Sequence, residues 1–298
     1  MRQYPKRSDV ISAARVAGHI ALVLAPIYLA AYMGPGLLLV AVWLWTGFTM
    51  QGLLNLIHEC AHYHVFKQRW ASDLLGRWFL APLVVADFDN YRKLHWAHHR
   101  ELGGAKDPKY SFKVDIRGWR LPLFFLQCLI GVEALKKFNY QKRERANSDL
   151  ANSQFWIIRV LVIHSIFAAS LFAVAWLGAR DLKLAALNAF IAYALEIYSV
   201  ISLTLFAATL RAIAEHQDGA DHPEVSGHAA LRNLKAGFLE RLIFGCYGFA
   251  EHATHHHYPA IPSYCLVEAT AELAVKAPEL TPRFNYRSIL AAQITSQT

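Results

Sequence analysis

Four long apolar runs dominate the chain, and each is close to the roughly 20 residues that a helix needs to cross the hydrocarbon core of a bilayer. Two shorter apolar runs, 74–86 and 119–135, are interrupted by Pro82 and Pro122, and we expect them to be re-entrant or interfacial. The pattern predicts an all-α integral membrane protein that forms a single domain over residues 1–298. Its predicted transmembrane helices cover about 11–33, 36–57, 155–178 and 184–210, and a helical cap is formed by 58–154 and 211–298.

Basic residues are distributed unevenly about these spans. The first fifteen residues hold four Lys or Arg, residues 64–154 hold sixteen, and the tail from Arg211 holds seven. The connector 33–36 holds none, and the connector 179–183 holds two. The positive-inside rule therefore predicts that both termini and the whole cap face the cytoplasm.

Composition adds two constraints on partners and compartment. The formal net charge of +8 is accompanied by no recognisable nucleic-acid module, so we expect no nucleic-acid partner and attribute the charge to topology and to attraction by anionic lipids. The cysteines are isolated in the sequence, which is typical of a reducing compartment without a disulfide framework. They are Cys60, Cys128, Cys246 and Cys265.

Eight of the fifteen histidines form three tight clusters just beyond the predicted spans, and a ninth, His216, follows the last span. The clusters have the spacings H-x-x-x-H, H-x-x-H-H and H-x-x-H-H, and on a helix residues three and four apart share a face. Neutral imidazole is the commonest metal ligand in proteins. Nine imidazoles exceed the four ligands of a tetrahedral ion, so we expect more than one metal ion. The clustered residues are His58, His62, His95, His98, His99, His252, His255 and His256.

Two other metal functions remain open at this point. Residues 58–62 also match H-E-x-x-H, in which two histidines bind zinc and the Glu is the general base of a protease, but that site would leave most of the clustered histidines without a role. We expect Glu59 instead to orient a histidine through its ring N–H, or to pair with a nearby Lys or Arg. A metal transport or storage protein would be expected to carry ligands within its spans.

The three histidine boxes, their order and their relation to the spans resemble the membrane fatty acid desaturase family, the histidine-box non-haem di-iron enzymes. Residues 58–62 look like the first box of the acyl-lipid and bacterial branch, residues 95–99 like the second and residues 252–256 like the third. The stretch 258–262 resembles the family's continuation after the third box, and His216 corresponds to its lone histidine before that box.

This resemblance implies a set of partners for the nine histidines. It implies that they hold two Fe ions that use O₂ as co-substrate, with electrons from an external donor, a ferredoxin or a cytochrome b5-like protein with its reductase. The implied reaction is desaturation of a fatty acyl or related membrane lipid chain. The alternative is hydroxylation or ketolation of a lipid, carotenoid or other hydrophobic molecule. Where the acyl-CoA branch has an Asn one turn before the lone histidine, this chain has Ala212, and His257 is an additional histidine in a supporting or solvated position.

Several charged residues carry secondary expectations. Glu196, inside the fourth predicted span, is expected to pair with His164 or to contact substrate. Asp87 and its neighbours ahead of the second box are expected to be loop and cap residues. A basic run is expected to be a solvated helix face or a docking surface for an acidic donor; it comprises Lys136, Lys137, Lys142, Arg143 and Arg145.

Overall fold

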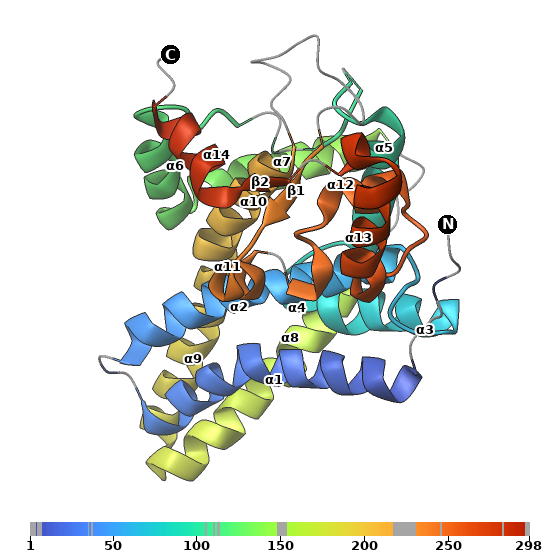
Figure 1. Ribbon diagram of the computed structural model, residues 1–298. Helices are drawn as coiled ribbons and strands as arrows, with labels where there is room; N and C mark the ends of the chain where they lie inside the picture. The colour runs from blue at the N-terminus through green and yellow to red at the C-terminus, as the bar shows by residue number, and fades with distance from the viewer. Residues whose placement is uncertain are drawn as a thin grey trace.

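Four long helices and a cap of shorter ones make up the part of the chain that the computed structural model describes (Figure 1). The described residues are 4, 8–34, 36, 38–104, 106–109, 111, 114–147, 154–216, 231–244, 246–281 and 283–295. The extreme ends of the chain, 1–3 and 296–298, lie outside the described residues, as do 148–153 and 217–230 of the predicted cytoplasmic parts.

The four long helices confirm the predicted spans, although two are longer than expected. The second continues to Ala61 rather than to 57, so His58 lies inside the helix and not beyond it. The fourth runs from Leu182 to Glu215, and its 34 residues make a rod of about 50 Å, longer than the roughly 30 Å hydrocarbon core. The spans are α1 (Asp9–Met33), α2 (Leu38–Ala61), α8 (Phe155–Ala179) and the continuous series α9 (Leu182–Ser199), a π-helical segment (Val200–Thr204) and α10 (Leu205–Glu215).

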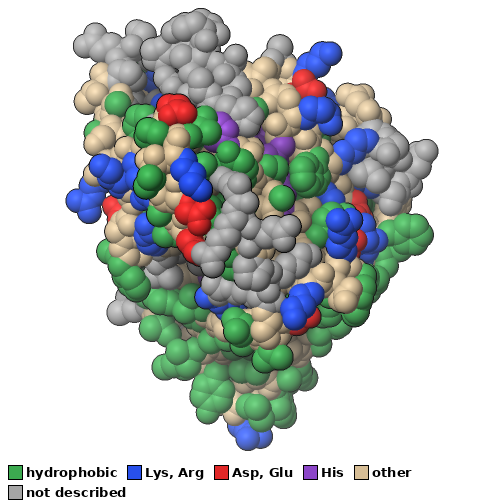
Figure 2. Space-filling model, turned by 45° about the vertical axis from the view of Figure 1, so that its right-hand side comes forward, with side chains coloured by type: hydrophobic (Ala, Val, Ile, Leu, Met, Phe, Trp, Pro, Cys, Tyr) green, Lys and Arg blue, Asp and Glu red, His purple; other side chains and the backbone are tan. Residues whose placement is uncertain are grey.

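The short connections α1–α2 and α8–α9 lie at the same end of the bundle. Gly34, which follows α1 with a φ of 82°, approaches the side chain of Asn188 in α9, and Gly178 of α8 packs against the backbone carbonyl of Tyr32 in α1. The ends of α2 and α10 therefore meet at the opposite end, where the cap lies. In Figure 2 hydrophobic side chains cover the lower, span-bearing part of the molecule, and charged side chains gather mainly on the cap above it.

The cap is built from short elements that follow the spans. Three of them pack against α2 and α8: α3 (Arg69–Leu74), a π-helical turn (Leu75–Leu80) and α4 (Ala81–Leu83). Among the described residues, neither of the short apolar runs 74–86 and 119–135 forms a further span. β1 (Asn233–Lys235) and β2 (Arg283–Asn285) pair in parallel, with Lys235 opposite Asn285. The other helices are α5 (Phe88–Glu101), α6 (Arg120–Leu129), α7 (Val132–Ala146), α11 (Phe238–Ile243), α12 (His252–His257), α13 (Leu266–Lys276) and α14 (Tyr286–Thr295), with 3₁₀ turns at Cys246–Gly248, Ser263–Cys265 and Pro278–Leu280.

The predicted pair of Glu196 and His164 is wrong. The Nε2 of His164 donates to the carbonyl oxygen of Pro82 at 2.9 Å, and its Nδ1 accepts from the hydroxyl of Tyr193 at 3.0 Å, so both ring nitrogens are already used. Glu196 is fully buried and its carboxylate has no hydrogen-bond partner among the described residues. The side chains of Glu196 and His164 therefore do not pair, although both lie within spans.

An ion pair between α7 and the start of α5 fixes the helix that carries the second histidine box. Asp87 caps α5 as predicted, because its Oδ1 accepts from the backbone amides of Asp89 and Asn90 at 3.1 and 3.3 Å. The other oxygen of Asp87 pairs with Arg145, which is therefore a largely buried partner of α5 and not part of a solvated face. Asp89 in turn accepts from Arg159 of α8 at 3.2 Å.

Replacing Gly178 with Ala is expected to destabilise the bundle by about 1–3 kcal/mol, because the added Cβ would collide with the backbone carbonyl of Tyr32 and force α1 and α8 apart. The measurement is thermal unfolding of the purified protein in one detergent. Gly18→Ala in α1 is the matched control: nothing lies within 4 Å of the added Cβ, so its midpoint should stay level or rise slightly. Equal midpoints for the two variants would contradict this close packing.

Candidate metal centre

All nine histidines singled out in the sequence converge in one region where four helices end. They come from the last turn of α2 and the residue after it, from α5, from the residue that follows α10 and from α12. Seven of them are buried and two, His95 and His99, are half-buried. The structure divides them into two groups.

The first group has five members whose ligand nitrogens all lie within 4.8 Å of one another. The Nε2 atoms of His62 and His95 are 2.7 Å apart, those of His95 and His99 are 3.0 Å apart, and those of His99 and His255 are 3.2 Å apart. His58 completes this five-histidine group, with its ring centroid 4.6 Å from that of His255.

The second group has four histidines and lies beside the first; it consists of two overlapping sets that share His216, one with His98 and His256 and the other with His252 and Glu215. The Nε2 of His216 is 3.2 Å from the Nε2 of His98 and 3.2 Å from that of His252. His256 completes this four-histidine group, and its ring stacks on His99 of the five-histidine group with 4.2 Å between centroids.

Helix geometry explains why each H-x-x-H-H box contributes to both groups. On α5, His95 and His99 are four residues apart, share a face and enter the five-histidine group, whereas the side chain of His98 is rotated away from them and enters the four-histidine group. α12 does the reverse: His252 and His256 enter the four-histidine group and His255 enters the other. The first two histidines of each box thus reach different groups, and the third adds a second ligand to the group of the first.

Polar partners on the outer ring nitrogens orient the histidines. The Nδ1 of His98 lies 2.8 Å from Asp107 Oδ2, and the Nδ1 of His216 lies 3.0 Å from the carbonyl oxygen of Ala212. A donated Nδ1–H fixes the tautomer in which Nε2 carries the free lone pair. The Nδ1 of His58 lies 3.4 Å from Glu59 Oε1. Glu59 thus lies beside a box histidine, and its other oxygen accepts the amide of Ser263 at 2.9 Å.

Sequence reasoning missed three charged residues that touch the four-histidine group. Glu215 lies 3.6 Å from His252 Nδ1, and only its position next to His216 could have indicated it. Asp107 and Lys109 come from the loop after α5, which has no motif. The Lys109 ammonium lies 3.1 Å from both ring nitrogens of His216 and 3.5 Å from His98 Nε2, and burial lowers its pKa to about 8.

A buried polar network holds α12 in place. The side-chain amide of Asn233 in β1 donates to the hydroxyl of Thr254 at 3.1 Å, and its carbonyl accepts the Thr254 amide at 3.2 Å. Thr254 also bonds Thr270 of α13 at 2.7 Å. Thr254 lies between the histidines of the third box, so these bonds set the rotation of α12 about its axis.

The donor set is suited to a metal ion. Burial, together with the proximity of other imidazoles, lowers the pKa of His62, His95, His255 and His256, which favours the neutral form that binds metals. The Nε2 atoms of His58 and His256 are buried with no hydrogen-bond partner among the described residues. Leaving a buried polar atom unbonded costs about 1–3 kcal/mol, and a metal ion would satisfy it. The cluster can therefore bind metal.

Comparison with known proteins places this cluster in a known family. The sequence pattern of the family described as fatty acid desaturase matches residues 9–288, which include all four spans and all nine histidines. The sn-1 oleoyl-lipid 12-desaturase of Synechocystis sp. is 36% identical over 86 residues, which are 27% of this chain and 24% of that protein.

Two further relatives carry related names. The sn-1 acyl-lipid omega-3 desaturase (ferredoxin) of Nostoc sp. is 30% identical over 85 residues, 28% of this chain and 23% of that protein. The chloroplastic omega-6 fatty acid desaturase of Spinacia oleracea is 28% identical over 106 residues, 35% of this chain and 24% of that protein. The chain thus aligns with about a quarter of the length of these relatives, whereas the family pattern extends over nearly its whole length. Together with the spans and the histidine boxes, this match confirms the inferred resemblance: the chain belongs to the fatty acid desaturase family.

Proposed function

We propose that this protein is an O₂-dependent desaturase of a fatty acyl chain carried by a membrane lipid, and that its nine clustered histidines hold two iron ions. The observation that carries the proposal is the division of nine neutral imidazoles into two adjacent groups at the end of a four-helix membrane bundle. Imidazole suits iron, and two groups in ring contact can serve two ions that act together. The names of the relatives support the acyl-lipid substrate.

Each group would hold one ion. His58, His62, His95, His99 and His255 would hold the first, and His98, His216, His252 and His256 the second. The Lys109 ammonium lies against nitrogens of the second group, so it and a metal ion would compete for the same lone pairs and Lys109 would withdraw on loading.

Two bound irons would supply the chemistry by which O₂, two electrons from a donor, two protons from solvent and the two hydrogens of adjacent carbons yield a double bond and two molecules of water. The protein residues position and shield that chemistry. Asp107 and the Ala212 carbonyl hold two ligand rings in one tautomer. Aromatic rings exclude water from the five-histidine group: Tyr91 stacks on His95 with 5.6 Å between centroids, and Phe249 meets His58 edge-on at 4.5 Å.

The proposal extends to the side of the membrane and the electron donor. The cap and its histidines lie at the basic ends of the spans, which supports a cytoplasmic site with both termini on the same side. Electrons come from a separate protein, a ferredoxin or a cytochrome b5-like donor with its reductase, and the ferredoxin in the name of the Nostoc relative supports the former.

Replacing one histidine in either group with Ala is expected to abolish desaturation and to lower the iron content from about two ions per chain to about one. His98→Ala tests the four-histidine group and His255→Ala the five-histidine group. The measurements are iron analysis of the purified protein and mass-spectrometric location of double bonds in the lipids of an expressing host. If the unaltered protein yields a hydroxylated or ketonic product, its reaction is oxygen insertion and not desaturation.

His257→Ala is the matched control, because His257 adjoins the third box but belongs to neither group. This variant should keep both irons and its activity. Full turnover by His255→Ala, or iron loss by His257→Ala equal to that of the box variants, would contradict the assignment.

Asp107→Asn is expected to weaken iron binding at the four-histidine group by about 10- to 100-fold, because the charge that holds the Nδ1–H of His98 is removed while the shape of the side chain is kept. Iron affinity is measured by competition with a chelator, and thermal unfolding of the apoprotein is followed in parallel. Asp115→Asn, on the same segment but paired with Arg117 and Arg120, should leave iron affinity unchanged. A loss of stability without a loss of affinity would show that Asp107 only supports the loop.

A further inference from the structure

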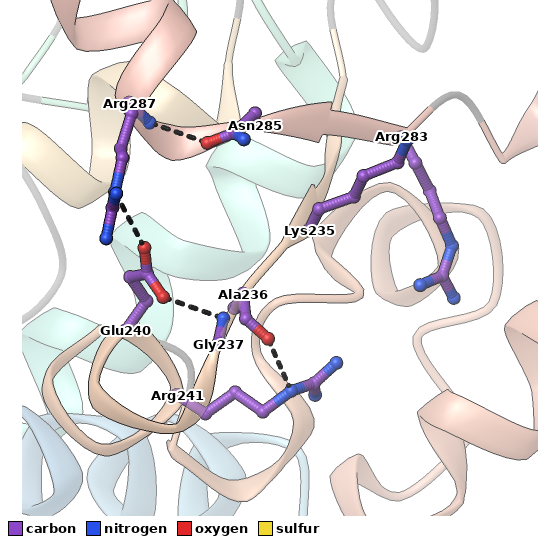
Figure 3. A pocket seen from close by; sticks show the side chains of 8 residues that line it. All are labelled: Lys235, Ala236, Gly237, Glu240, Arg241, Arg283, Asn285 and Arg287. Carbon is purple, nitrogen blue, oxygen red and sulfur yellow. Dashed lines mark hydrogen bonds and ion pairs between the residues drawn. The ribbon is translucent and has the colours of Figure 1, made fainter.

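A polar hollow lies in the cap, and four basic side chains line it (Figure 3). The cavity has a volume of about 430 Å³, within the usual range for ligand pockets. β1 supplies Lys235, β2 supplies Arg283 and Asn285, and α11 and α14 supply Arg241 and Arg287. Because β1 and β2 pair in register, Lys235 is held opposite Asn285, and Arg283 shares a strand face with Asn285.

The hollow has an excess of positive charge. Among the described residues that line it, Glu240 is the only acid; it accepts the amide of Gly237 at 2.7 Å and lies 3.6 Å from Arg287. Arg283 pairs with the buried Glu251 at 3.1 Å. Four cations against these two carboxylates leave two positive charges, and Arg241 commits only its Nε among the described contacts, to the carbonyl of Ala236. Guanidinium forks of this kind match the geometry of a phosphate group.

An apolar hollow adjoins the basic one. It has a volume of about 390 Å³, and it shares Gly237, Glu240 and Arg287 with the first cavity. Its rim carries Phe238 and Leu239, whose exposed fractions are 81% and 65%, unusually high for large apolar side chains. α11 also packs against the membrane span α2, and in Figure 1 it lies beside α2 where the spans give way to the cap.

We propose that the basic hollow binds the phosphate of an anionic phospholipid of the surrounding membrane, with the lipid's apolar part against Phe238 and Leu239. A phosphate ester next to a hydrocarbon chain is the ligand that matches a cationic cavity joined to an exposed apolar one. The membrane is favoured over an acidic protein because Phe238 and Leu239 would be costly to expose to water and lie on a helix that contacts a span. The lining of this site includes none of the nine histidines.

The lipid site is linked to the metal centre through one ion pair. Arg283 lines the hollow and bonds Glu251, which directly precedes His252 at the start of α12. A phosphate in the hollow would compete with Glu251 for the same guanidinium. Occupancy can therefore be sensed at the third histidine box.

The test measures binding of short-chain phosphatidylglycerol and phosphatidylcholine to the full-length protein in nanodiscs by native mass spectrometry. The unaltered protein should retain phosphatidylglycerol in preference to phosphatidylcholine. Lys235→Gln combined with Arg287→Gln should lower that affinity about thirtyfold, because each basic residue near an anionic surface contributes about a factor of five. Lys276→Gln, an exposed charge on α13 outside the hollow, should have no effect.

Two further measurements distinguish a membrane lipid from a soluble phosphate ester as the ligand. Phe238→Ala with Leu239→Ala should weaken phosphatidylglycerol binding but not that of glycerol phosphate, and Val275→Ala, 85% exposed on α13, is its control. Glycerol phosphate that binds as tightly as the lipid would overturn the proposal in favour of a soluble ester. Equal binding of the two lipids by the unaltered protein would also overturn it. So would a variant with both charges removed that still binds the lipid but no longer binds an acidic electron-donor protein.

Discussion

The structure depends on holding nine neutral imidazoles together in a volume that excludes water. An imidazolium has no lone pair for a metal and repels its neighbours, so burial at the end of the bundle is a condition for the site and not an incidental result of packing. It also explains why helices extend beyond what a bilayer requires. α2 continues to Ala61 and thus carries His58 in its final turn, and the fourth helix runs through 34 residues to deliver His216.

The spacing of each histidine box follows from the same condition. A helix turns by about 100° per residue, so a residue and the one four places later point the same way while the residue next to either points elsewhere. The two histidines of α5 that are four residues apart enter the five-histidine group, and the corresponding two of α12 enter the four-histidine group. In each H-x-x-H-H box the first two histidines, three residues apart, enter different groups, and the third gives the group of the first histidine a second ligand. Two short helices can thus supply three ligands to each group.

Much of this could be predicted from the sequence, and what could not was non-local. Hydropathy located the spans, and spacing located the nine histidines, because both are repeated local signals. The division into five and four required the rotations of α5 and α12, which depend on contacts such as Asn233 with Thr254. Asp107 and Lys109 reach the site from a loop without a motif, and Arg145 is used by Asp87 far away in the sequence. Nothing in the sequence indicates that His164 bonds Pro82 and Tyr193 rather than Glu196.

Three carboxylates near the histidines can balance the charge of bound metal ions. Imidazole ligands are neutral, so two bound cations would bring their full charge into a buried region unless anions stood near. Glu59, Asp107 and Glu215 each lie within 3.6 Å of the Nδ1 of a box histidine. Asp107 bonds the Nδ1 of His98 and so orients that ring, and each of the three carboxylates, when ionised, supplies negative charge beside the centre. The residues that supply orientation and countercharge are therefore as much a part of the centre as the histidines.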